Sequence, residues 1–80
     1  MNYKFKVGDR VKVSDTGSGF GISELGLIFT ISELGEYCDD ETPGYRVYPI
    51  GGNGHGGYSN GFNGEGSFEL VKPKSGWKDV

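Results

Sequence analysis

The sequence predicts a small all-β domain, a barrel of four or five short strands. Segments rich in β-branched, aromatic or alternating residues recur along the chain, and turn residues separate them roughly every eight to twelve positions. No window of about ten residues carries a helical period. Eighty residues make one domain, near the lower limit for folding without disulfides or a metal.

The N-terminal segment 4–13 is predicted to form a bent strand pair. Gly8 and Asp9 favour a turn, because glycine tolerates unusual backbone angles and aspartate bonds to neighbouring amides. Valines and basic residues then alternate over 10–13, which is the period-2 pattern of a half-buried strand.

The strongest strand signal lies at 27–32, where the residues are β-branched or aromatic. Both faces of this segment are apolar, so we expect a central strand or one at a bend of the barrel. A polar loop over 14–21 and one turn over 22–24 are expected before it.

A third strand is predicted at 45–50. It follows an acidic loop at 36–44 that ends in Pro43-Gly44, a turn dipeptide. Pro49 cannot donate to a ladder, so this strand lies at an edge or ends there. Residues 67–71 are expected to close the sheet.

A glycine-rich run occupies residues 51–66 and holds eight glycines. It is either a long ordered loop or a hairpin with its turn at Asn53-Gly54, a dipeptide suited to type I′ geometry. Ordering sixteen unpaired residues would cost on the order of 20 kcal/mol, more than the net stability of a small domain, about 5–15 kcal/mol. We therefore expect the hairpin, with Pro49 opposite Tyr58 and Val47 opposite Asn60.

Cysteine usage and hydropathy indicate a cytoplasmic protein. The single cysteine, Cys38, excludes an internal disulfide and a multi-cysteine metal site. No apolar run has the length of a signal peptide or a membrane span, so no membrane partner is expected.

Charge is unevenly distributed. The formal net charge of −3 argues against a general attraction to nucleic-acid phosphates. Seven acidic residues and no basic one lie between Ser14 and Tyr45, whereas seven of the eight basic residues lie in 4–12 and 72–78. A fold that joins the two ends would be basic there and acidic on the opposite loops.

Two stretches resemble the SH3-like barrel group. Val7 to Val13, followed by Gly26 to Ile31, looks like the first two strands of KOW-type modules, and 59–71 is loosely similar to the closing segment of the Mib/Herc2 type. The tryptophan and Arg-Gly-Pro-Asp signature of the latter is missing, and RNA-binding KOW modules are usually more basic. The resemblance implies an SH3-like barrel over 1–72 with a C-terminal tail at 73–80, and it carries over no functional residue. The general look of the chain also resembles small phage-encoded proteins.

Motifs for catalysis or cofactors do not fit their required context. Residues 52–57 match G-x-G-x-x-G, but no helix can follow to receive a phosphate. The sequence has one histidine, His55, and one cysteine, Cys38, so it lacks the paired spacing of zinc ligands. Nothing in it orients His55 as a base for a nucleophilic Cys38. The acidic run at 39–41 lacks the spacing of a calcium loop. We therefore expect no enzyme, no cofactor, no metal and no catalytic residue.

Aromatic side chains near the loops are the best functional lead, because tyrosine buries much area at low entropic cost. Two interpretations stay open: these rings form a binding surface, or several of them fill a small core. The acidic run is either a solvated turn or an attractive site for a basic partner. The candidate binding residues are Phe20, Tyr37, Asp39, Asp40, Glu41, Tyr45, Tyr48, Tyr58 and Phe62.

The expected function is a non-enzymatic protein-binding module, an adaptor or a small inhibitor of a larger protein. Its partner would be a protein with a basic surface. The alternative is KOW-like nucleic-acid binding through the basic residues at both ends, Lys4, Lys6, Arg10, Lys12 and the lysines of the tail.

Overall fold

The computed structural model describes residues 2–56 and 58–71, with the exception of the Tyr58 side chain. This part of the chain is all-β and contains no α-helix. Its strands are β1 (Arg10–Val13), β2 (Ile28–Glu36), β3 (Pro43–Tyr48), β4 (Asn63–Gly64) and β5 (Phe68–Leu70). Short 3-10 turns connect them: η1 (Ile22–Glu24), η2 (Gly52–His55), η3 (Tyr58–Gly61) and η4 (Glu65–Ser67). The predicted tail at 73–80 and the boundary at 72 lie outside the described residues.

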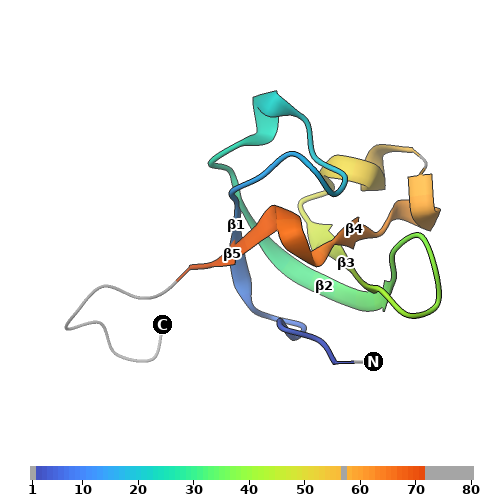
Figure 1. Ribbon diagram of the computed structural model, residues 1–80. Helices are drawn as coiled ribbons and strands as arrows, with labels where there is room; N and C mark the ends of the chain where they lie inside the picture. The colour runs from blue at the N-terminus through green and yellow to red at the C-terminus, as the bar shows by residue number, and fades with distance from the viewer. Residues whose placement is uncertain (1, 57, 72–80) are drawn as a thin grey trace.

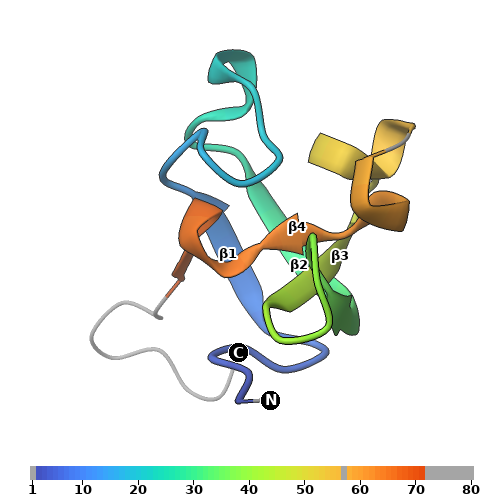
Figure 2. The same cartoon turned by 45° about the vertical axis from the view of Figure 1, so that its right-hand side comes forward.

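The strands form one antiparallel sheet in the order β4-β3-β2-β1-β5 (Figure 1). This sheet is not closed into the barrel that the sequence suggested, because β4 and β5 are its two edges. They are consecutive along the chain, and η4 carries the backbone from one edge to the other without pairing them. The sheet nevertheless curves around one core, as the two views show (Figures 1 and 2).

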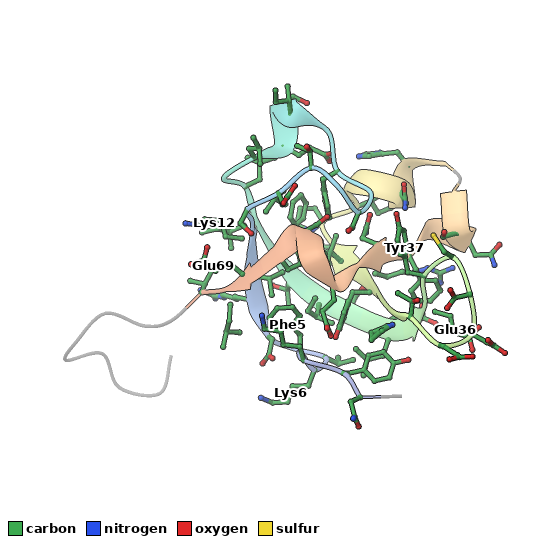
Figure 3. All side chains as sticks on the ribbon, in the orientation of Figure 1. Phe5, Lys6, Lys12, Glu36, Tyr37 and Glu69 are labelled. Carbon is green, nitrogen blue, oxygen red and sulfur yellow. The ribbon has the colours of Figure 1, made fainter. Side chains whose placement is uncertain are left out.

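Only the second half of the predicted N-terminal strand pair is a strand. The expected turn is present: the Asp9 backbone amide donates to the Lys6 carbonyl at 3.0 Å, and Gly8 has a φ of 97°. The segment before the turn is not paired in the sheet. Its Phe5 ring is buried against Tyr45 and Phe68, so packing rather than strand pairing holds it in place (Figure 3).

β2 is the central strand, as predicted, and it continues four residues beyond the expected end. Phe29 and Ile31 point into the core, whereas Ile28 on the opposite face is exposed. A bulge interrupts the pairing with β3 between Ile31 and Glu33. It shifts the alternation by one residue, so that Leu34 again packs against the core.

The β2–β3 hairpin turns at 37–42, earlier than predicted. Tyr37 donates its amide to the Thr42 carbonyl at 2.9 Å, and Cys38 has a φ of 71°. Pro43-Gly44, expected to be the turn, is instead paired in β3, opposite Glu36 and Gly35. β3 ends at Tyr48, directly before Pro49, as the missing amide of proline requires.

The core consists of side chains from every strand except β4, together with one residue from the segment before β1 and one from the loop after it. Its members are Phe5, Val11, Val13, Phe20, Phe29, Ile31, Tyr45, Val47 and Phe68. Five of these nine are aromatic, and their rings meet mostly edge to face at centroid distances of 5.3 to 6.1 Å. Such pairs add about 0.5–1.5 kcal/mol each beyond area burial.

The predicted hairpin in the glycine-rich run is wrong. Asn53-Gly54 lies inside η2, and β3 pairs with β4 instead, through Gly44 with Gly64 and Tyr45 with Asn63. The described part of the run, 51–56 and 58–66, therefore contains η2, η3, the two-residue strand β4 and the start of η4. The strand partners expected for Pro49 and Val47 within this run do not form.

Side chains supply hydrogen bonds in place of those that the hairpin would have made. Asn63, with none of its surface exposed, accepts the Asn53 amide at 2.8 Å and donates to the Tyr45 carbonyl at 3.2 Å. Glu24 accepts the Gly52 amide at 2.8 Å, and the Asn53 side chain donates to the Phe62 carbonyl at 2.8 Å. These long-range bonds recover part of the entropy cost of ordering the run.

Within the described part of the chain, none of the helical segments has the length and apolar character needed to cross a bilayer.

Candidate functional site

Two of the predicted binding residues belong to the core. Phe20 packs on Phe29 and Phe68, and Tyr45 touches Tyr3, Phe5 and Phe68. Both are buried, Phe20 with 3% and Tyr45 with 0% of its surface exposed. The core interpretation therefore holds for these two rings, and they cannot touch a partner directly.

The Tyr45 hydroxyl fastens the N-terminal segment to η4. It accepts the backbone amides of Lys4 and Phe5 and donates to Glu65 at 2.5 Å, while Glu65 also accepts the Lys4 amide at 2.8 Å. Burial and the hydrogen bond to Glu65 raise the pKa of Tyr45 to about 12. This cluster is structural, because its polar atoms are used within the chain.

Tyr37 and Phe62 are half-buried against glycines. A Cβ at Gly64 would lie 3.0 Å from the Tyr37 ring, and one at Gly35 would lie 2.4 Å from the ring of Phe62. The Arg46 guanidinium covers Phe62 at 4.5 Å from the ring centroid. These two aromatic residues therefore fix the loops to the sheet. The side chain of Tyr58 lies outside the described residues.

Tyr48 is the predicted aromatic that the structure leaves open. It is 71% exposed at the end of β3, and Ile50 beside it is 61% exposed. Both line a groove of about 480 Å³ between β3 and the glycine-rich loop. We name it the Tyr48 groove; its lining residues are Ser32, Arg46, Val47, Tyr48, Ile50, Asn53, Gly54, Asn60 and Gly61.

A second hollow of about 340 Å³ lies between the β2–β3 loop and η3. We name it the acidic hollow; it is lined by Glu36, Cys38, Asp39, Asp40, Ser59 and Asn60. Figure 3 shows Glu36 at the base of the loop, on the side away from the N-terminal strand. Of the predicted acidic residues, Asp39 and Asp40 line this hollow and Glu41 does not.

Asp39 also shapes the loop that bears it. Its Oδ1 accepts the Glu41 amide at 2.9 Å and the Thr42 hydroxyl at 2.8 Å. These hydrogen bonds favour the carboxylate, so they lower the pKa of Asp39 below its ordinary value. The loop therefore keeps its negative charge in a fixed position at neutral pH.

The two hollows meet at Asn60, which lines both of them. Asn60 lies in η3 with a φ of 56°, and its carbonyl accepts the Arg46 guanidinium at 2.6 Å. Arg46 also pairs with Glu33 at 2.7 Å. This arginine thus binds η3 to β3 and fixes the ridge between the Tyr48 groove and the acidic hollow.

The residues of this surface that sequence reasoning missed include Glu36, Arg46, Ile50 and Asn60. The alternation of β3 could have found Arg46, because it points to the same side as Tyr48. The position of Asn60 depends on the fold of the glycine-rich run and left no local signal.

The basic residues of the N-terminal segment line neither the Tyr48 groove nor the acidic hollow. Lys4 and Lys12 line a hollow of about 850 Å³ beside β5. Lys12 lies opposite Glu69 across the β1–β5 pair, and Figure 3 shows the two side chains together. Lys6 forms an ion pair with Asp9 at 3.2 Å. Acidic neighbours thus offset part of the charge of these lysines.

A cluster of metal-ligating side chains is absent among residues 2–56 and 58–71. No group of three His, Cys, Asp or Glu side chains there could hold an ion. Cys38 is exposed, and the Ser59 hydroxyl lies 3.8 Å from its sulfur, a contact that suits loop packing. His55 lies in η2, whereas Cys38 lies in the loop between β2 and β3.

Comparison with known proteins gave no relative: no family model matches the chain, and neither the curated proteins nor the solved structures include a similar one.

Proposed function

We propose that this chain is a non-enzymatic protein-binding module, an adaptor or a small inhibitor of a larger protein. Its contact surface consists of the Tyr48 groove and the adjoining acidic hollow. The observation that carries this proposal is the large exposed tyrosine at the rim of a groove whose walls are held by hydrogen bonds. Exposed aromatic side chains beside a rigid groove are the usual anchors of protein interfaces.

The surface near the groove is apolar beyond Tyr48 itself. Thr30 lies opposite Tyr48, so Ile28 is its diagonal neighbour on the outer face of the sheet, and Ile28 is exposed. Together with Ile50 these residues offer a contact area that a lone surface aromatic would not provide. The proposal also agrees with the SH3-like resemblance, because such barrels bind peptides in aromatic-lined grooves between loops.

The test is site-specific photo-crosslinking with a photoreactive amino acid placed at Tyr48, in an extract of the native host. The matched control carries the same amino acid at Ile22, which is 82% exposed on η1 and lies outside the groove. We expect a partner protein to be captured from Tyr48 and not from Ile22. With the purified partner, Tyr48→Ala should weaken binding about thirtyfold, the effect of a typical interface hot spot, while Ile22→Ala leaves it unchanged.

Unfolding of the Tyr48→Ala variant would assign this ring to stability instead of binding, and equal capture from both positions would refute the proposed surface. Nucleic-acid binding through the N-terminal lysines remains the competing proposal. It predicts retardation of RNA or DNA at low salt that weakens steeply as salt rises. Retardation unaffected by Tyr48→Ala would favour it.

A further inference from the structure

The Tyr48 groove and the acidic hollow differ sharply in chemistry although they share a wall. The groove presents Tyr48 and Ile50, both largely exposed. The hollow presents the carboxylates of Glu36, Asp39 and Asp40. An occupant that touches both must therefore carry an apolar group and a cation close together.

Among the described residues that line the two hollows, Arg46 is the one cation, and it does not oppose such an occupant. Arg46 lines the groove, but its guanidinium is paired with Glu33 at 2.7 Å and with the Asn60 carbonyl at 2.6 Å. It also lies over the Phe62 ring. Its charge is thus offset within the chain, so the three carboxylates of the hollow dominate the local field.

The occupant has to be elongated. The ridge between the two hollows is narrow, because a single residue, Asn60, lines both sides of it. An extended segment rises about 3.3 Å per residue. A few residues of such a segment can place one side chain on each side of the ridge.

Resting on the protein-binding function proposed above, we propose that the occupant is an extended segment of the partner that carries a large apolar side chain with a lysine or arginine within a few residues of it. The apolar side chain packs on Tyr48 and Ile50, and the cation enters the acidic hollow. Charge complementarity selects this segment over an anionic one, since like charges brought together in an interface are costly.

The experiment selects dodecapeptides from a random displayed library on the purified protein, with no assumption about the natural partner. We expect the selected peptides to combine an apolar residue with Lys or Arg. Their affinity should fall as salt rises from about 50 to about 300 mM, because screening weakens contacts between exposed charges. A synthetic peptide with glutamine in place of its basic residue should bind about three- to tenfold more weakly.

Two variants locate the charge contact. E36Q/D40N removes two carboxylates of the hollow and should weaken the selected peptide about three- to tenfold. Asp39 is left intact because it holds the loop. The matched control is Glu41→Gln, because Glu41 belongs to the same loop but lies outside the hollow. This substitution should change the affinity less than twofold.

The outcomes separate this inference from the proposed function. Selected peptides that need Tyr48 but show no enrichment of basic residues, or that bind equally to E36Q/D40N, overturn the inference and leave the binding module standing. Peptides that are insensitive to Tyr48→Ala overturn both. A stable homodimer that buries Tyr48, seen by light scattering and lost in Tyr48→Ala, assigns the groove to a second copy and also overturns the inference.

Discussion

Replacing Asn63 with alanine tests whether one buried amide holds the glycine-rich run in place. The substitution removes the acceptor of the Asn53 amide and the donor to the Tyr45 carbonyl, bonds of 2.8 and 3.2 Å. Each stranded polar group in a buried site costs about 1–3 kcal/mol. The loss should total about 2–4 kcal/mol of unfolding free energy, a large share of the roughly 5–15 kcal/mol available to a small domain.

Thermal unfolding followed by circular dichroism measures this loss. At about 4–8 °C per kcal/mol for a domain of this size, the midpoint should fall by about 8–32 °C. Asn2→Ala, at an exposed position, is the matched control and should stay within about 0.5 kcal/mol of the parent. Amide hydrogen exchange adds a local readout, because the Asn53 amide should lose its protection first. An Asn63→Ala protein as stable as Asn2→Ala would refute the reasoning that side-chain bonds replace the missing hairpin.

Two further predictions concern the hairpin and the N-terminal clasp. Gly44→Ala should destabilise the fold by about 2–3 kcal/mol in urea unfolding, because the new Cβ would lie 2.7 Å from the backbone of Glu36. The control is Gly21→Ala, which has open space around it and should cost much less stability. Equal losses of stability in the two variants would disprove the close approach at Gly44. The pKa of Tyr45 is about 12 in the fold against about 10 when unfolded, so the stability linked to it is present below pH 10 and is lost as the pH rises through 12. Absorbance titration should show a late tyrosinate step that Tyr45→Phe removes, and a late step that persists in this variant would contradict its assignment to Tyr45.

The parts of the fold that sequence reasoning predicted are those fixed by local pattern. The valines of β1, the β-branched run of β2 and the stop before Pro49 each follow from side-chain alternation or from backbone chemistry. The turn at Gly8 and Asp9 is also local, since the bonds that close it join residues three apart.

The glycine-rich run could not be predicted in this way. Asn53-Gly54 is a strong hairpin signal, but the bonds that decide its conformation come from Asn63, ten residues away, and from Glu24, twenty-eight residues away from Gly52. A wholly unpaired run would indeed be costly, but side chains, instead of a second strand, satisfy part of its backbone.

The candidate surface was predictable in part. The sequence predicts both Tyr45 and Tyr48 as binding residues, yet they are three positions apart along one strand, so they face opposite sides of the sheet. Side-chain alternation alone would have assigned one of these two tyrosines to the core. The meeting of Tyr48 with the acidic loop at Asn60 depends on the path of η3 and required the structure.

The bulge between Ile31 and Glu33 governs where the acidic loop can act. It inserts one unpaired residue, Ser32, before the outer half of the hairpin. If β2 instead paired without the bulge, with Ser32 opposite Arg46, each later position of the strand would point to the other side of the sheet. The carboxylate of Glu36 would then leave the wall that it shares with Asn60, and Leu34 would be turned toward water. The bulge therefore decides on which side of the sheet the hairpin offers the charge of Glu36 to a partner.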